Sequence, residues 1–156
     1  MQSWLAGKLV RRNMEALNAG DVKPSLRLDA RNVEFTFPGD SSWAGVYRGK
    51  KQLRPWLQRF TEVGLQIFAD EIVVKGLPWR STVCIRGHDH LDGPDGERVY
   101  DNRYVIWGRL AWGRLKAYEV YEDTQKSQAL DEWLQRGAAS SSQSSSARSR
   151  RWRRRR

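Results

Sequence analysis

Two different periods of apolar residues divide the chain. Apolar side chains recur every three to four residues from Ser3 to Ala19 and again from Lys50 to Val63, which predicts two amphipathic helices. A short helix is expected between them, around residues 24–28. Because Pro55 would lie deep inside the later helix, we expect that helix to begin nearer Gln52.

Apolar and polar residues alternate at residues 32–37, and from Leu65 onward the chain changes to this period of two, which predicts strands. The expected strands cover residues 32–37, 45–49, 65–75, 79–91, 98–107 and 112–122. A tight turn is expected over residues 92–96, and a last helix over residues 124–135. Gly87 lies inside one of these strands and indicates a bulge or a bend.

The last stretch of the chain differs from the rest in composition. Residues 138–146 are nearly all Ser, and residues 147–156 contain seven Arg. Removing those charges from the net charge of +10 leaves 10 − 7 = +3 for the rest, so the body of the protein is only mildly basic. We therefore expect one domain over residues 1–137 and a disordered Ser- and Arg-rich tail over residues 138–156.

Cys84 is the only cysteine, so no internal disulfide can form, and a reducing, cytoplasmic location is expected. No segment approaches the about 18 consecutive apolar residues of a membrane span, and the N-terminus does not resemble a signal peptide. His88 and His90 flank Asp89, but consecutive residues of a strand face opposite sides of the sheet, so Asp89 faces away from the two histidines. We therefore expect neither a metal site nor a cofactor.

Helices followed by long antiparallel strands and a closing helix indicate an α+β fold. Four segments carry a resemblance to a known family: ALNAGD, NVEFTFPG, YRGKKQLRPWLQRF and GRLKAYEVYEDT. Over about residues 3–136 the chain resembles the SnoaL-like, polyketide cyclase-like proteins of the nuclear transport factor 2-like superfamily, which also contains ketosteroid isomerase and limonene-epoxide hydrolase. The resemblance implies a curved antiparallel mixed sheet wrapped around the N-terminal helices, with a cone-shaped pocket of the cystatin-like, SnoaL-like type.

The resemblance also implies which side chains face that pocket. The implied ligand-binding residues are Asn13, Phe35, Phe37, Trp56, Trp79, Val83, Ile85, Asp89, Val105, Trp107, Val120 and Glu122. Three further polar residues are candidates for catalysis: Asp101 as a base, Arg103 as an orienting group and Tyr118 as a hydrogen-bond donor. If the last turn lies within residues 108–113, Arg103 lies opposite Val120 and Asp101 opposite Glu122. A one-residue shift in register would reverse a whole strand.

The catalytic sets of the best-known relatives are mostly missing. The positions of the isomerase's Tyr, base and protonated Asp correspond to Asn13, Phe35 or Thr36, and Val105. Of the hydrolase's Asp–Arg–Asp set only the first remains, as Asp89, because Gly87 and Val120 occupy the other two positions. SnoaL-type cyclisation needs only a modest acid/base device in an apolar pocket, so acid/base chemistry on an apolar oxygenated compound is the favoured function.

Two other functions stay open. The chain could be a non-catalytic ligand-binding or homodimer-forming module, with Tyr100, Tyr104 and Ile106 on the outer sheet face as the contact patch. The Arg tail could tether nucleic acid or another anionic surface by charge alone. The cluster of Asp101, Arg103 and neighbouring carboxylates could also be a structural ion-pair network.

Overall fold

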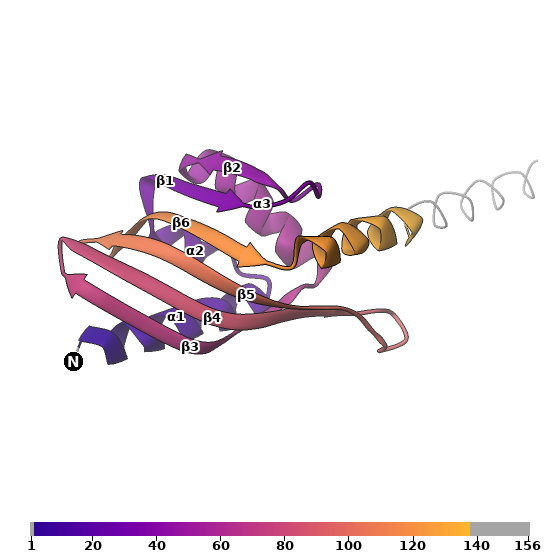
Figure 1. Cartoon of the computed structure of the whole chain (residues 1–156), viewed down its shortest axis with the longest axis horizontal. Helices are drawn as coiled ribbons and strands as arrows, with labels where there is room; N and C mark the ends of the chain where they lie inside the picture. The colour runs from indigo at the N-terminus through magenta and orange to yellow at the C-terminus, as the bar shows by residue number, and fades with distance from the viewer. Residues whose placement is uncertain (1, 138–156) are drawn as a thin grey trace, which may run out of the picture.

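Six strands form one mixed sheet in the order β2-β1-β6-β5-β4-β3 (Figure 1). The computed structural model describes residues 2–137, and the tail expected to be disordered lies outside these described residues. A helix that carries no label in Figure 1 covers residues 124–137. The other elements are α1 (Gln2–Asn18), α2 (Lys23–Leu28), β1 (Asp29–Phe37), β2 (Gly45–Arg48), α3 (Gly49–Val63), β3 (Gln66–Leu77), β4 (Arg80–Asp92), β5 (Arg98–Ala111) and β6 (Arg114–Glu122).

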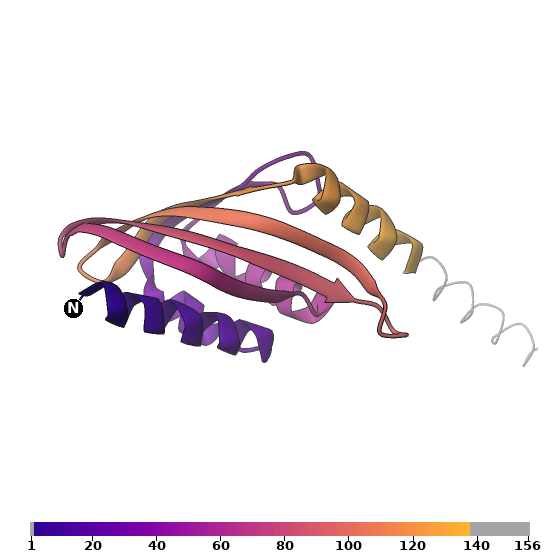
Figure 2. The ribbon, with the colours of Figure 1, turned by 60° about the horizontal axis from the view of Figure 1, so that its bottom comes forward.

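The sheet is curved, and the N-terminal helices lie against its concave side (Figure 2). β1 and β6 are parallel, whereas all other neighbouring strands of the sheet are antiparallel. α1 packs against β3, and α3 packs against β1. The expected α+β fold, with a curved mixed sheet around N-terminal helices, is confirmed. No helix within residues 2–137 has the length and apolar character needed to cross a membrane.

Apolar side chains from the concave face and the helices form the main core. Val33 and Phe35 of β1 and Leu53 of α3 are the largest side chains that are fully buried. A second cluster gathers around Trp43 and includes Leu130 of the last helix, which fixes that helix to the body. The two clusters leave an apolar space between the sheet and the helices, where the site described below lies.

The helix α3 starts earlier in the chain than the expected position near Gln52. The helix begins at Gly49, which has a left-handed backbone with φ of 73°. Gln52 accepts a hydrogen bond from the backbone N–H of Arg48 at 2.7 Å and so caps the first turn. Pro55 lies inside the helix on its exposed side, where the helix loses one backbone hydrogen bond but no packing.

Gly87 faces the concave side of β4 at a point of very close packing. An added Cβ would lie 2.1 Å from the backbone oxygen of Phe68 and 2.4 Å from the hydroxyl oxygen of Tyr104. The bulge indicated by this glycine is in the neighbouring strand β3, between Ala69 and Glu71. The Tyr104 hydroxyl donates to the Phe68 carbonyl at 2.8 Å, so the glycine makes room for a tyrosine that ties β5 to β3.

The register of β5 against β6 differs from the expected one. The observed opposite pairs are Ile106–Val120 and Tyr104–Glu122. Arg103 and Asp101, expected at these positions, therefore lie on the outer face of the sheet. Tyr104 and Ile106, expected on the outer face, belong to the core side.

Two register shifts together cause this reversal. β5 carries an extra residue, Val99, opposite β4, between the pairs Leu91–Tyr100 and Asp92–Arg98, and the second shift lies between β5 and β6. Leu110 pairs with Leu115 in the ordinary hairpin register, but Arg109 pairs with Ala117, so Lys116 is an extra residue in β6. Without the extra residue, the turn at residues 112–113 would place Val105 opposite Val120. Because side chains alternate along a strand, one extra residue is enough to change which face of β5 meets the pocket side of β6.

Candidate functional site

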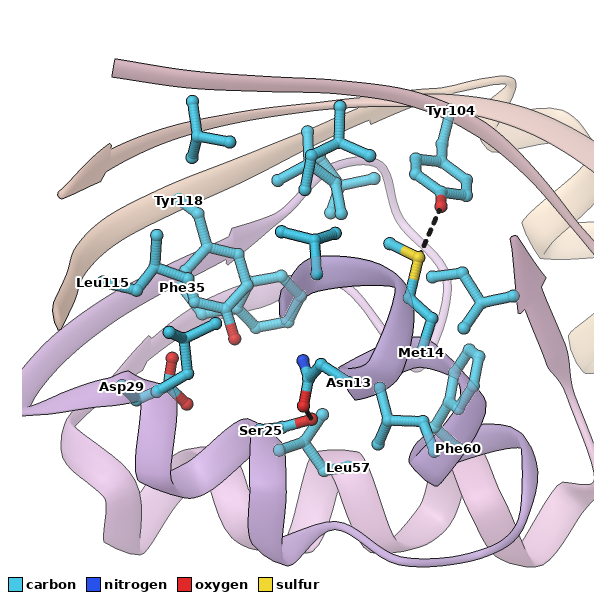
Figure 3. Close-up of a pocket in the computed structure, with 18 of the residues that line it drawn as sticks. Asn13, Met14, Ser25, Asp29, Phe35, Leu57, Phe60, Tyr104, Leu115 and Tyr118 are labelled. Carbon is cyan, nitrogen blue, oxygen red and sulfur yellow. Dashed lines mark hydrogen bonds between the residues drawn. The ribbon is translucent and has the colours of Figure 1, made fainter. Parts of the chain in front are cut away.

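A cavity of about 220 Å³ lies between the concave sheet face and the three N-terminal helices. Its walls are mainly apolar, and they come from every element except β2 and the last helix (Figure 3). The apolar lining residues include Val10, Met14, Leu17, Phe35, Phe37, Trp56, Leu57, Phe60, Ile67, Val83, Ile85, Ile106 and Leu115. Such walls bind the hydrocarbon part of a ligand, so orientation depends on the few polar groups among them.

Asp29 is the most enclosed of these polar groups. It is the first residue of β1 and follows α2 directly, and its backbone N–H donates to the Ser25 carbonyl. Its side chain is buried in the cavity wall, and its Oδ2 atom has no hydrogen-bond partner among the described residues. Burial raises the pKa of Asp29 from 3.8 to about 7, although the charge of Lys50 opposes this. Near neutral pH this carboxyl can therefore give or take a proton.

The Tyr118 hydroxyl enters the cavity from β6 beside Asp29 (Figure 3). Burial, together with the nearby charge of Asp29, raises the Tyr118 pKa well above its ordinary value. The phenol therefore stays protonated and can donate a hydrogen bond.

Asn13 faces the same part of the cavity from α1. Its Oδ1 atom accepts a hydrogen bond from the Ser25 hydroxyl at 3.0 Å. The amide nitrogen then points away from Ser25 and toward the interior (Figure 3). Asn13 and Tyr118 thus offer two donors near one buried carboxyl, Asp29.

A second group of polar residues occupies another part of the cavity wall. Burial raises the pKa of Asp89 to about 6 and that of Glu122 to about 7, and the charge of Asp89 adds to the shift of Glu122. The Tyr100 hydroxyl donates to Asp89 at 3.4 Å and accepts a hydrogen bond from Asn102 at 3.2 Å. The Ser127 hydroxyl donates to Glu122. Asp89 keeps one oxygen, Oδ1, without a partner among the described residues.

Comparison with known proteins places this architecture among solved structures. No family model matches the chain, and no curated protein matches it. Bal32a, from a soil-derived mobile gene cassette, superposes with a TM-score of 0.66 at 23% identity, over 85% of this chain and 98% of that one. An NTF2-like protein of unknown function from Burkholderia pseudomallei superposes with a TM-score of 0.63 at 19% identity, over 76% of this chain and 90% of that one.

The chain has an NTF2-like fold. The structure of TerC co-crystallised with polyporic acid is similar as well, with a TM-score of 0.62 at 17% identity, over 75% of this chain and 90% of TerC. A protein with a cystatin-like fold from Xanthomonas campestris is also among the similar structures. The NTF2-like resemblance drawn from the sequence is therefore confirmed at the level of fold.

Many of the side chains expected to face the pocket line the NTF2-like cavity. They come from both helices and strands: Asn13, Phe35, Phe37, Trp56, Val83, Ile85, Asp89, Tyr118, Val120 and Glu122. The strand residues among them all lie on β1, β4 and β6. Their expected orientation agrees with the structure because the alternation of these strands is unbroken across the positions concerned.

The structure places the other expected residues away from the cavity. Asp101, Arg103, Val105 and Trp107 lie on the outer face because of the two register shifts that flank them, one between β4 and β5 and one between β5 and β6. Trp79 lies in the turn between β3 and β4 and is 53% exposed. The ion pair of Asp101 with Lys126, at 3.2 Å, shows the outward environment of that carboxylate.

Several lining residues could not be singled out from the sequence. Asp29 lies three residues before the start of the expected first strand, and only the observed start of β1 turns it inward. Tyr104 and Ile106 were predicted on the wrong face because the register was shifted by one residue. Gly113 after Trp112 was a sequence signal for a two-residue turn at these positions. Among the described residues, no group of His, Cys, Asp and Glu is arranged to hold a metal ion.

Proposed function

We propose that this NTF2-like domain binds a small, apolar, oxygenated compound and transfers a proton within it. The observation that carries the proposal is Asp29, a buried carboxyl in a mainly apolar cavity, with an oxygen that has no partner among the described residues. An ionisable group is costly to bury without a partner, and its retention at a cavity wall is typical of an acid or base. The similarity to TerC, which was co-crystallised with polyporic acid, supports a small-molecule ligand.

In the proposed chemistry, ionised Asp29 takes a proton from a carbon next to a ligand carbonyl. The C–H bond breaks, its proton moves to the carboxylate, and its electron pair becomes an enolate. Tyr118 and Asn13 donate hydrogen bonds to the carbonyl oxygen, where negative charge develops. Where a C=C bond is conjugated with the enolate, protonated Asp29 can return the proton at the far carbon, which isomerises the ligand. Alternatively, the enolate carbon attacks a second carbonyl and closes a ring, and the alkoxide formed there takes the proton back from Asp29.

Asp89 has a different role in this proposal. Its free Oδ1 atom can accept a hydrogen bond from a hydroxyl group at another position of the ligand, or donate one when protonated. Tyr100 and Asn102 hold the carboxyl in place. A ligand with oxygen functions at two separated positions would therefore be bound in one orientation.

The test uses a panel of apolar cyclic ketones with an acidic C–H bond. Binding is followed by the fluorescence change of Trp56 and the other tryptophans, and proton transfer by exchange of the C–H proton in D₂O. Asp29→Asn should reduce exchange at least about 100-fold while binding changes little, because the isosteric amide cannot accept the proton. The matched control is Asp101→Asn, on the outer face. Undiminished exchange in Asp29→Asn would remove Asp29 as the base, and an equal loss in Asp101→Asn would place the chemistry on the other face.

A second role is favoured by the outer face of the sheet, which we propose joins two copies of the chain. Trp107 of β5 and Tyr121 of β6 are 52% and 53% exposed, and they lie on neighbouring strands of the same face. Large exposed aromatics on an open sheet face are typical of a contact surface. Light scattering should give twice the mass of one chain, and Trp107→Ala should lower it. A monomer at high concentration would overturn this role and leave the cavity proposal untouched.

A further inference from the structure

Exposed apolar side chains surround the open end of the cavity. Leu9 of α1 lines the cavity and is nevertheless 52% exposed. Gly113 also lines the cavity, and its neighbour Trp112 is 73% exposed. Trp79 packs against Trp112, with ring centroids 6.1 Å apart. With Leu77, which is 54% exposed, these side chains form what we call the mouth rim: Leu9, Leu77, Trp79 and Trp112.

The mouth rim is assembled from three separate parts of the chain. The N-terminal half of α1, the turn between β3 and β4 and the turn between β5 and β6 lie at the same end of the molecule in both views (Figures 1 and 2). The backbone N–H of Trp112 donates to the carbonyl of Pro78 at 2.7 Å and joins the two turns. The two tryptophans are thus presented as one surface.

Trp112 occupies an unusual backbone conformation. Its φ of 54° lies in the left-handed region, and it is the only non-glycine residue within the described part of the chain to have a positive φ. Such a conformation is energetically costly for a residue that has a side chain, and the first position of a two-residue hairpin turn is ordinarily taken by Asn, Asp or Gly. A large exposed aromatic kept there against this cost points to a use outside the fold's own packing.

The surroundings of the mouth rim are basic. The three segments that build this end, residues 2–10, 75–82 and 107–117, contain no Asp and no Glu. They contain the following basic residues: Lys8, Lys75, Arg80, Arg109, Arg114 and Lys116. These segments therefore contain no carboxylate that could neutralise the positive charge, and the end of the molecule around the mouth favours an anionic partner.

We propose that the mouth rim docks on an anionic lipid bilayer, with the open end of the cavity facing the membrane. Exposed Trp and Leu side chains enter the interfacial region of a bilayer, where the amphipathic indole ring is favoured. Lys and Arg around them are attracted to the anionic headgroups near the membrane surface. Docking in this orientation would let an apolar ligand pass between bilayer and cavity without crossing water. Docking on the membrane does not depend on proton transfer by Asp29, so an experiment can disprove either proposal without affecting the other.

The experiment measures partition of the full chain onto large vesicles at physiological salt. Vesicles of phosphatidylcholine alone are compared with vesicles containing 30% phosphatidylserine, and partition is expected only with the latter. Because the seven Arg of residues 147–156 could also attract anionic lipid, the decisive comparison is between variants. The double variant Trp79→Ala/Trp112→Ala should lower partition about tenfold, while Val46→Ala, which removes an exposed apolar side chain of β2, should change it less than twofold.

A charge reversal gives a second and independent readout. Arg80→Glu changes one exposed residue beside Trp79 and should lower partition about tenfold or more. Unchanged partition in both the double variant and Arg80→Glu would overturn the proposal and assign lipid binding to the Arg tail. Absence of partition in the parent chain, or a Trp-dependent preference for duplex DNA over vesicles, would overturn it as well.

Discussion

The two faces of the sheet give the same residue type opposite properties. Asp89 and Asp101 lie on neighbouring antiparallel strands. On the concave face Asp89 is 8% exposed, its pKa is raised to about 6, and one of its oxygens has no partner among the described residues. On the outer face the Asp101 side chain is 70% exposed and pairs with Lys126 at 3.2 Å. Environment, rather than residue type, makes one carboxyl reactive and the other inert.

Other charged residues follow the same division. On the outer face Arg86 pairs with Glu71 at 3.2 Å, and His88 pairs with Asp70 at 2.9 Å. All four side chains are about half exposed or more, so these contacts contribute little to stability. On the concave face the carboxyls of Asp89 and Glu122 are held by uncharged hydroxyl donors, which leaves their charge uncompensated.

The largest expected difference between the faces is steric. Gly87→Ala would place a methyl group against the Phe68 backbone oxygen, which cannot move without breaking the sheet. We expect a loss of ~4 kcal/mol in the free energy of unfolding, or failure to fold, measured by urea denaturation. Arg86→Ala, at the adjacent position on the outer face, should cost less than ~1 kcal/mol. Equal losses in the two variants would show that the faces do not differ in packing.

The fold could be predicted from the sequence because its signals are spread over many residues. The helical period of residues 3–19 and 50–63, and the alternation at residues 32–37 and after residue 64, each extend over whole elements. No single position therefore decides which element is predicted. The lining residues on β1 and β4 were predicted correctly. Phe35 and Phe37, like Val83 and Ile85, are two residues apart on one strand and therefore face the same side of the sheet. Errors at element ends, such as the start of α3, leave these faces unchanged.

The candidate site was less predictable because single residues decide it. Val99 is one extra residue in β5 and Lys116 is one extra residue in β6, and together they move Asp101 and Arg103 from the expected pocket side to the outer face. Nothing in the alternation of β5 distinguishes the two registers, because each of the two faces of this strand carries both apolar and polar residues. Asp29 depends on tertiary context too, because its burial results from packing of α2 and β1 that local sequence does not encode.

The pH dependence of stability gives the smaller of the two expected differences. The pKa of Asp29, and likewise of Asp89 and Glu122, is raised in the folded chain above its unfolded value, so the folded state binds protons more tightly. Their contribution is fully present below about pH 4 and is lost as the pH rises through about 6 to 7. The free energy of unfolding should therefore decrease between these values, by on the order of 3 kcal/mol for Asp29 alone.

Two isosteric variants separate this effect from the general charge of the protein. Asp29→Asn removes a titrating group from the concave face, so its free energy of unfolding should decrease less steeply with pH than that of the parent and should equal or exceed it above pH 7. Asp101→Asn removes the same charge from the outer face, where the ion pair with Lys126 is exposed, and should leave the slope unchanged. Urea titrations at a series of pH values measure both. A parent whose stability is constant from pH 4 to 7 would mean that water or an ion reaches the Asp29 oxygen and that the carboxyl is not held in an apolar wall.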